Sequence, residues 1–415
     1  MEKYKEYKDS GVQWLGEIPS HWKAVLNGRI FKENVRKALD TDISLSLSQK
    51  DGLIPTEEMQ ESSLKTSSYA NWKHVTPCDL VINRFKAHLG VMFASNYTGM
   101  VSFHYGIFKS VIPTNSKYYE YLFHTNVYKF LYSDVSNGMT VGLQNLSNTA
   151  FYKVRGLYPP IDEQCSIVSY LDTKCSQLDT LLSNKEKEIS LLQEMKQRVI
   201  ADAVTRGINP SVKFKTTNIP WLPEIPEHWE MSKVSSHFCQ RNVKVSDKEY
   251  PALSVSKMGV TPQLDNIALS NAEGNSRKLV KIGDYAVNSR SDRKGSCGVS
   301  QYEGSVSLIT IVLEPFDIDR GYVHYLFRSN PWIEEFYRNG RGIVADLWTT
   351  NYQMMKGMYL PVPPHSEQRS IVSYITERAS KIDLLIEKLN KEIECIKEYK
   401  QRLISDVVTG QVKVC

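Results

Sequence analysis

The sequence lacks several features that would assign it to particular protein classes. Its seven cysteines include no CxxC pair, which argues against a zinc site or a disulfide framework and favours a reducing compartment. No stretch approaches the roughly 18 apolar residues that a membrane helix needs, and no apolar run follows the charged N-terminal residues as in a signal peptide. We therefore expect a soluble, cytoplasmic protein with no membrane partner.

Motifs that carry common chemistry are also missing. The sequence has no GxxxxGK[ST] phosphate loop, no HExxH and no GxSxG. The proline pairs at 159–160 and 363–364 lack the flanking residues of an amino-methyltransferase pocket, and the histidines and cysteines do not fall at metal-ligand spacing. We therefore expect a non-catalytic chain that binds no metal and no cofactor of its own.

The charge of the chain is small but unevenly distributed. Its 415 residues carry 51 Lys and Arg against 46 Asp and Glu, a net charge of +5, which is too small to predict a nucleic-acid partner. By segment the charge is +4 in residues 1–160, −2 in 161–207, +2 in 208–360 and +1 in 361–415. The basic excess therefore lies mainly in the first and third segments.

The chain contains two copies of one unit. Three motifs of the first half recur in the same order in the second half, and their spacing falls only from 207 to 204 residues. Collinear matches of this kind indicate a duplication with small insertions between the matches. The matched segments are WLGEIPSHW at 14–22 and WLPEIPEHW at 221–229, DLVIN at 79–83 and DYAVN at 284–288, and EQCSIVSY at 163–170 and EQRSIVSY at 367–374.

Each copy begins with a globular part. Residues 1–160 and 208–360 are rich in Gly, Asn, Ser and Tyr and contain short apolar runs such as those at 80–82 and 308–313. This texture predicts two α+β domains built on short strands and loops. We interpret the four tryptophans of the repeated WLxEIPxHW motif as core anchors rather than base-stacking platforms.

Each copy ends with a long helix. Residues 162–205 and 366–409 contain no Pro or Gly, and 19 of the 22 a and d positions of their heptad repeat are apolar, which is typical of a coiled coil. Two helices of equal length favour pairing within the chain over pairing with another protein, and either a parallel or an antiparallel pair is topologically possible. The predicted interface residues are Leu171, Leu178, Leu182, Ile189, Leu192, Ile375, Ile382, Ile386, Leu389, Ile393 and Ile396.

Loops in the globular parts carry residues that suit DNA contacts. Arg, Lys, Asn, Gln and Ser form hydrogen bonds with phosphates and base edges, and they gather at matching places in the two copies. An ordinary solvated turn is the alternative interpretation for each loop. The candidate DNA-binding residues are Ser48, Gln49, Lys50, Asn83, Arg84, Lys86, Ser256, Lys257, Asn288, Arg290, Arg293 and Lys294.

The order of these motifs resembles that of the specificity subunits of type I restriction-modification systems. The twin WLxEIPxHW openings, the DLVIN-type segments, the PPxxEQ entries to the helices and the Asp-(Ala/Val)-Val-Thr helix ends carry the resemblance over the whole chain. The copies differ at the helix ends, DAVTRG against DVVTG. The resemblance implies target recognition domains at 1–160 and 208–360, each for one half of a bipartite DNA site, and spacer helices at 161–207 and 361–415 that pair antiparallel.

The resemblance also implies partners. Two modification subunits that bind S-adenosylmethionine and methylate adenine would dock on the helices and adjoining surfaces, and restriction subunits would add translocation and cleavage that use ATP and Mg. Two alternatives stay open: a recognition subunit of another bipartite, type IIB-like restriction enzyme, and a bivalent scaffold that binds proteins rather than DNA.

Overall fold

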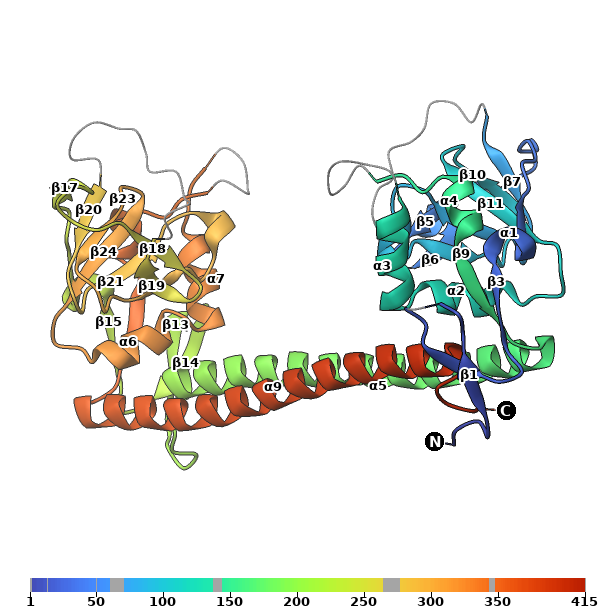
Figure 1. Cartoon of the computed structure of the whole chain (residues 1–415). Helices are drawn as coiled ribbons and strands as arrows, with labels where there is room; N and C mark the ends of the chain where they lie inside the picture. The colour runs from blue at the N-terminus through green and yellow to red at the C-terminus, as the bar shows by residue number, and fades with distance from the viewer. Residues whose placement is uncertain are drawn as a thin grey trace. The chain divides into compact units, whose positions relative to one another are not determined.

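The computed structural model describes residues 2–12, 14–49, 51–59, 71–136, 144–263, 277–342 and 348–414. The chain divides into two compact units, of which unit 1 comprises Met1–Lys185 and Lys391–Cys415 and unit 2 comprises Glu186–Asn390. Each unit contains one globular domain and part of each of two long helices, α5 (Ile161–Arg206) and α9 (His365–Val408) (Figure 1). These elements confirm the predicted α+β class. Among the described residues, no helix is both long enough and apolar enough to span a membrane.

The domain of unit 1 is organised around a four-stranded antiparallel sheet of order β4-β11-β8-β9. Short hairpins and helices surround this sheet. The sheet strands are β4 (Phe31–Glu33), β11 (Tyr105–Ser110), β8 (Leu80–Asn83) and β9 (Met92–Ala94). The other pairs are β1 (Tyr7–Asp9) with β2 (Glu17–Pro19), β3 (Lys23–Leu26) with β12 (Arg155–Tyr158), β5 (Leu45–Ser48) with β6 (Gly52–Pro55), and β7 (Lys73–Val75) with β10 (Gly99–Val101). The helices are α1 (Asn27–Ile30), α2 (Ser116–Phe123), α3 (Asn126–Val135) and α4 (Asn148–Lys153).

The domain of unit 2 repeats this arrangement. Its four-stranded antiparallel sheet has the order β16-β24-β21-β22, formed by β16 (Phe238–Gln240), β24 (Thr310–Pro315), β21 (Tyr285–Asn288) and β22 (Cys297–Val299). The other strands are β13 (Phe214–Ile219) with β14 (Leu222–Pro226), β15 (Glu230–Lys233) with β25 (Tyr359–Val362), β18 (Leu253–Ser256) with β19 (Gly259–Pro262), and β20 (Arg277–Val280) between β17 (Lys244–Val245) and β23 (Gly304–Ser307). The helices are α6 (Arg320–Leu326), α7 (Asn330–Arg338) and α8 (Tyr352–Met355).

The repeated DLVIN and DYAVN segments form the inner strands β8 and β21. Successive side chains of a strand point to opposite faces, and both faces of these strands are covered. In β8, Leu80 and Ile82 join the aromatic core while Val81 joins a second apolar cluster. In β21, Tyr285 belongs to one cluster and Ala286 to another. Burial on both faces explains why the motif is a continuous apolar run rather than an alternating one.

The repeated motifs bind each other at the entry to each long helix. Glu163 in the first turn of α5 accepts a 2.6 Å hydrogen bond from Trp22 Nε1 and lies 2.7 Å from His21 Nε2. In unit 2, Glu367 lies 2.7 Å from His228 Nε2. Trp22 and Trp229 are both fully buried, as expected of core anchors. The carboxylate at the helix entry is therefore held by His and Trp in unit 1 and by His in unit 2.

The glutamine that follows each of these glutamates ties the helix to its domain. The fully buried Gln164 accepts a hydrogen bond from the Asn115 backbone amide and donates one to the Pro159 carbonyl. Gln368 in unit 2 forms the same two bonds, with Asp319 and Pro363. Because buried amides need partners on both their oxygen and their nitrogen, the Glu-Gln pair explains why this motif recurs at both helix entries.

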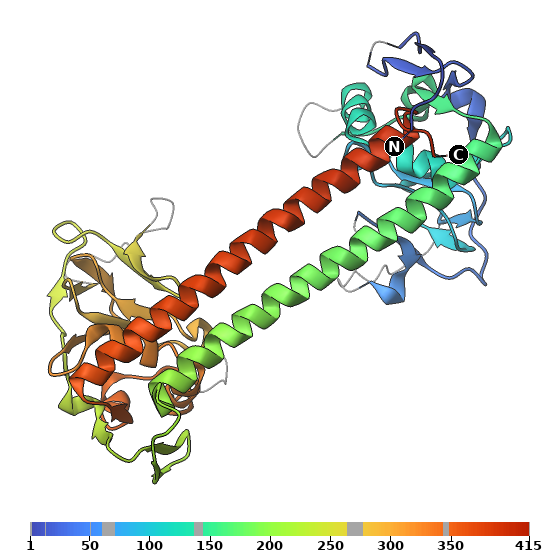
Figure 2. The same ribbon diagram turned by 90° about the horizontal axis from the view of Figure 1, so that it is seen from below.

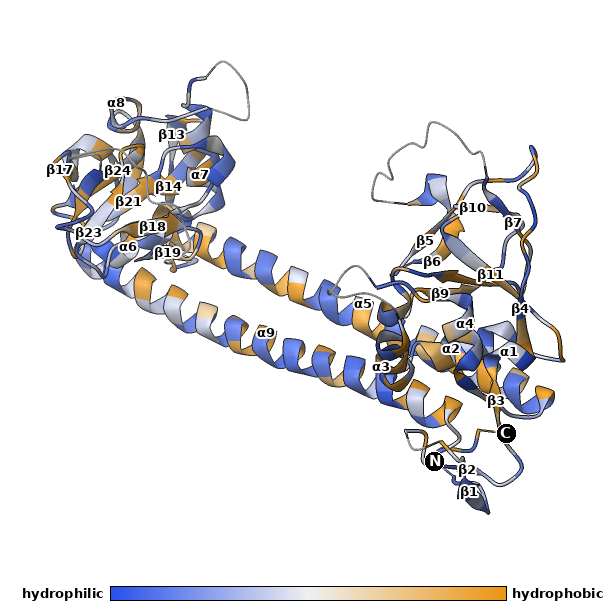
Figure 3. Ribbon diagram, turned by 45° about the horizontal axis from the view of Figure 1, so that its top comes forward, coloured by the Kyte–Doolittle hydropathy of each residue, from blue (hydrophilic) through white to orange (hydrophobic). Residues whose placement is uncertain are grey.

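The two long helices run antiparallel within each unit. In unit 1, Asp179 of α5 lies 2.6 Å from Lys400 and Lys185 lies 2.7 Å from Glu392, so residue numbers rise along one helix as they fall along the other. In unit 2, Lys196 lies 2.7 Å from Asp383. Figure 2 shows the two helices alongside each other, and the hydropathy colours of the ribbon in Figure 3 show hydrophobic residues interspersed among hydrophilic ones along both helices.

The predicted interface residues occupy the less exposed face of each helix. Five of them are buried, namely Leu171, Ile375, Ile382, Leu389 and Ile393, and six are half-buried, namely Leu178, Leu182, Ile189, Leu192, Ile386 and Ile396. A two-helix seam leaves the flanks of its side chains open to solvent, which accounts for the half-buried positions.

The two ends of the chain meet in unit 1. Glu2 pairs with Lys413 as an isolated β-bridge, the Tyr7 hydroxyl donates to the Gly410 carbonyl at 3.1 Å, and Gln411 Nε2 donates to the Glu17 carbonyl at 2.9 Å. The N-terminal hairpin β1–β2 is therefore fastened to the residues that follow α9.

Candidate nucleic-acid interface

The candidate loops of unit 1 gather at one edge of its domain. Asn83, the last residue of β8, pairs with Tyr105, the first residue of β11, so the loop after β8 and the turn before β11 are neighbours. The β5–β6 hairpin lies beside these loops. Its Gly52 packs against β9, since a Cβ on this residue would lie 3.3 Å from the Phe93 ring. We call this the loop edge of unit 1: residues 48–49 and 51, loop 84–91 and turn 102–104.

The loop edge of unit 2 comprises the equivalent segments 256–258, 289–296 and 307–309. Asn288 of β21 pairs with Thr310 of β24. The β18–β19 hairpin packs against β22, since a Cβ on Gly298 would lie 3.1 Å from the Cα of Gly259. The structure therefore brings together the two groups of candidate residues that are far apart in each half of the sequence. Lys50 lies outside the described residues.

The hairpin serines have turn-closing contacts. Ser48 Oγ donates to Asp51 Oδ2 at 3.1 Å, and Ser256 Oγ accepts from the Met258 amide at 3.1 Å. Their neighbours Gln49 and Lys257 are exposed. Within each hairpin the serine therefore shapes the turn, while the following long polar side chain faces solvent.

The loop after β8 contains two cationic side chains, of which Arg84 is ion-paired and Lys86 is exposed. Arg84 Nη2 donates to Glu33 Oε1 at 2.6 Å and is half-buried, and Asn83 Oδ1 accepts from the Phe85 amide at 3.1 Å. Lys86 is exposed. This geometry favours loop positioning by Asn83 and Arg84 and a ligand contact by Lys86.

The loop after β21 presents three cations, each beside a carboxylate. Arg290 Nε lies 3.0 Å from Asp292, Arg293 Nε lies 3.7 Å from the same residue, and Lys294 Nζ lies 3.0 Å from Glu334. Asn288 Oδ1 accepts from the Arg290 amide at 3.2 Å. Exposed ion pairs contribute only about 0–1 kcal/mol, so these cations can exchange their partners for phosphates or base edges.

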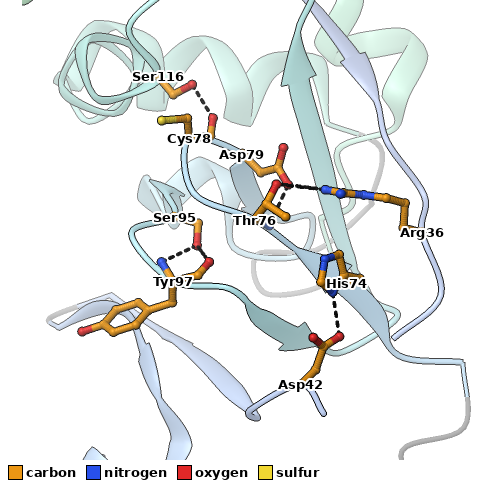
Figure 4. Close-up of polar contacts among 9 residues, drawn as sticks. All are labelled: Arg36, Asp42, His74, Thr76, Cys78, Asp79, Ser95, Tyr97 and Ser116. Carbon is orange, nitrogen blue, oxygen red and sulfur yellow. Dashed lines mark hydrogen bonds and ion pairs between the residues drawn. The ribbon is translucent and has the colours of Figure 1, made fainter. Parts of the chain in front are cut away.

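A polar network at the other end of strand β8 has a structural role (Figure 4). The buried Asp79 accepts hydrogen bonds at 2.9 Å from Arg36 and from both the amide and the hydroxyl of Thr76. Its counterpart Asp284 lies 2.6 Å from Arg241 Nε. A buried carboxylate needs such partners, which explains why the motif of the inner strands begins with Asp.

Two lysines at the loop edges were not predicted from the sequence. Lys73 Nζ donates to the Tyr105 carbonyl at 2.7 Å, and Lys278 Nζ donates to the Thr310 carbonyl at 2.8 Å. Burial lowers the pKa of both side chains. Their spacing of 205 residues equals that of the DLVIN and DYAVN segments, a signal that could have identified them.

The described residues do not form a metal centre: no three of their His, Cys, Asp or Glu side chains are grouped so as to hold an ion.

Comparison with known proteins shows what the chain is similar to. No family model matches the sequence.

The similar curated proteins are specificity subunits. The putative type I restriction enzyme MjaX specificity subunit of Methanocaldococcus jannaschii is 25% identical over 302 residues, which cover 70% of this chain and 65% of that protein. The MjaVIII specificity subunit of the same organism is 23% identical, over 66% of this chain and 65% of that protein. The EcoBI specificity subunit of Escherichia coli is 21% identical, over 71% and 66%. The chain thus spans about two thirds of the length of these relatives.

Two solved structures share the fold. A chain from a study of complex assembly and conformational transition of the type I R-M system has a TM-score of 0.72 at 12% identity, covering 95% of this chain and 99% of that one. The HsdS subunit of Thermoanaerobacter tengcongensis has a TM-score of 0.55 at 13% identity, covering 97% and 100%. Two globular domains and two long helices are thus the fold that the chain shares with these structures, and its sequence is similar to those of type I restriction enzyme specificity subunits.

Proposed function

We propose that this chain is the DNA-recognition subunit of a type I restriction-modification complex, in which each globular domain binds one half of a bipartite site. The observation that carries the proposal is the repeated loop edge. In both domains the same three segments meet at the end of the inner strand and expose long polar or cationic side chains such as Gln49, Lys86, Lys257 and Arg293. Such side chains suit hydrogen bonds with phosphates and base edges.

The two loop edges differ in chemistry at equivalent positions. Unit 2 has the ion pair between Lys294 and Glu334, whereas the positions 205 and 204 residues earlier are the exposed Leu89 and Phe130. Charged side chains and apolar side chains favour different base edges. We infer that the two half-sites have different sequences.

The helices would set the distance between the half-sites and dock two modification subunits. Besides the buried seam, they expose apolar side chains: Leu181 and Tyr399 in unit 1, and Leu191, Met195 and Leu385 in unit 2. Leu181 and Leu385, like Met195 and Tyr399, are related by the 204-residue repeat. Apolar residues in equivalent positions outside the seam suit two copies of one partner.

Catalysis would belong to the partners. The modification subunits would bind S-adenosylmethionine, and the restriction subunits would use ATP and Mg. The relatives of this chain are specificity subunits, and their names do not favour the type IIB-like enzyme or the protein scaffold.

Methylome sequencing tests the proposal. The gene is expressed with its modification subunits in a host free of this methylation, and methyladenine is mapped by single-molecule sequencing with and without the gene. We expect one two-part motif, separated by a fixed gap, that disappears with this chain. A motif that persists without the chain would contradict the proposal, as would a complex that binds no DNA under conditions in which it assembles.

A further inference from the structure

Both domains expose apolar side chains at a turn where polar residues are the norm. In unit 1 the turn before β11 carries Phe103, 50% exposed, and His104. In unit 2 the turn before β24 carries Leu308 and Ile309, 42% and 45% exposed. Turns favour Gly, Asn, Asp, Ser and Pro because these residues suit the backbone or bond to it. We call these two pairs tip 1 and tip 2.

The tips occupy equivalent positions and are held in the same way. They lie 205 residues apart, each one residue beyond a matched serine, Ser102 or Ser307. The carbonyl that follows each tip accepts a hydrogen bond from a half-buried lysine, Lys73 at 2.7 Å or Lys278 at 2.8 Å. An ammonium group held against a carbonyl fixes the backbone at the base of the turn, so the tips are supported projections rather than loose loops.

Each tip adjoins a candidate DNA-binding loop. The residue after tip 1 pairs with Asn83, and the residue after tip 2 pairs with Asn288. In unit 1 the rings also meet: the centroid of His104 lies 3.9 Å from that of Phe103 and 5.8 Å from that of the exposed Phe85. An apolar projection therefore stands directly beside the polar side chains of each loop edge.

The apolar side chains of the tips do not suit contact with phosphates. Leu308, Ile309 and Phe103 carry no hydrogen-bond donor and no charge, whereas the apolar surface that DNA offers is the thymine 5-methyl group and the faces of the bases. We propose that the tips make apolar contact with bases of the two half-sites, which rests on the proposed DNA-recognition function. The apolar character is shared by both tips while their residues differ, as expected of two domains that bind different half-sites.

The test uses the full chain in complex with its modification subunits. Leu308→Ser with Ile309→Ser alters tip 2, and Phe103→Ser alters tip 1. Val111→Ser and Phe316→Ser are matched controls, because Val111 and Phe316 are exposed at equivalent positions just beyond the other ends of β11 and β24. Dissociation constants are measured by fluorescence anisotropy over a salt series, for a duplex with the methylated motif and an unrelated duplex of equal length. Thermal unfolding checks that every variant is folded.

We expect the tip variants to lose about tenfold in affinity for the specific duplex, with little loss for the unrelated one and an unchanged salt slope, since base contacts release no counterions. Duplexes with uracil in place of thymine distinguish contact with the thymine methyl group from contact with a base face. If the wild-type complex loses as much affinity for the uracil duplex as the tip variants lose for the thymine duplex, the contact is with the methyl group. If the wild-type complex binds both duplexes equally, the contact is with a base face. Equal affinities of tip and control variants, or a changed salt slope, would overturn the inference. A wild-type complex that binds no DNA would instead contradict the proposed function itself.

Discussion

Lys400 Nζ lies 2.6 Å from Asp179 Oδ1, at a position of the helix seam where the heptad pattern calls for an apolar residue. The equivalent pair 204 residues away, Lys196 with Asp383, has the same geometry at 2.7 Å. Both lysines are exceptions to the apolar seam, and both bond to the opposite helix. A polar residue at a seam position commonly fixes register at some cost in stability.

The two lysine–aspartate pairs across the helices are predicted to fix the register in which α5 and α9 pair. In Lys196→Leu with Lys400→Leu, we expect an equal or higher melting temperature, because apolar residues fill the seam, together with a looser choice of helix register. Disulfide trapping between cysteines placed across the helices measures the register. The charge swap Asp179→Lys with Lys400→Asp is the control, and it should restore most of the roughly 0.5 kcal/mol that either single change costs. A single trapped register in the leucine variant would refute the role of the lysines.

Helix length predicts the gap in the DNA site. Insertion of one heptad into both α5 and α9 adds about 10 Å at 1.5 Å per residue, which corresponds to roughly three base pairs. We expect a methylated motif with unchanged half-sites and a longer gap. Insertion into α5 alone is the control and should abolish methylation, because the seam loses its register. An unchanged gap in the double insertion would contradict the spacer role.

The helix entries predict unequal effects of equivalent substitutions. Glu163→Ala removes the acceptor of the buried Trp22 N–H and should lower the free energy of unfolding of unit 1 by about 2 kcal/mol. Glu367→Ala should cost less, because Trp229 Nε1 has no hydrogen-bond partner among the described residues and so loses none. Denaturant unfolding of both variants measures the difference, with the exposed Asp162→Ala as control. Equal costs at the two sites would show that the Trp22 bond contributes nothing.

Substitution of the loop arginines Arg290 and Arg293 distinguishes contact with a base from contact with a phosphate. If Arg290 contacts a base, Arg290→Ala should relax one half-site at a cost of about 1–3 kcal/mol in discrimination, whereas a phosphate contact gives uniform weakening and a shallower salt slope. The same comparison applies to Arg293. Lys281→Ala is the matched control, since Lys281 is exposed before the start of β21, at the end remote from the loop edge. Binding identical to that of the control would remove these arginines from the interface.

The half-buried His124 predicts a loss of stability in acid. Burial lowers the pKa of His124 to about 4, with the charge of Lys129 as a second cause, while the unfolded chain has a pKa near 6.5. Between these values the unfolded state binds more protons, so stability is complete above pH 6.5 and falls as the pH drops toward 4, by about 3 kcal/mol for this group. His124→Gln should flatten the melting temperature between pH 7 and pH 5, and exposed His104→Gln should not. Parallel pH profiles for wild type and His124→Gln would disprove this assignment.

The two long helices and the two similar domains could be predicted from the sequence. The heptad pattern predicted the helices, and the duplication predicted two similar domains, because both are statements about spacing. The roles of single residues depended on partners that are distant in sequence. Arg84 remains a predicted DNA contact, and its ion pair with Glu33, 2.6 Å away and 51 residues earlier, could not be predicted from the sequence. The 205-residue spacing of Lys73 and Lys278 relates the two lysines, but their bonds to backbone carbonyls could not be predicted from the sequence.

The division of the chain into units has a consequence for its synthesis. Unit 2 is continuous, from Glu186 to Asn390, whereas unit 1 needs both the first 185 residues and those from Lys391 onward. During synthesis, unit 2 can therefore complete its core first. Until the end of α9 is made, the apolar face of α5 in unit 1 stays uncovered. Only when the end of α9 emerges can Leu403 and Val407 join the core of unit 1. Residues that follow unit 2 in the sequence thus close the core of unit 1.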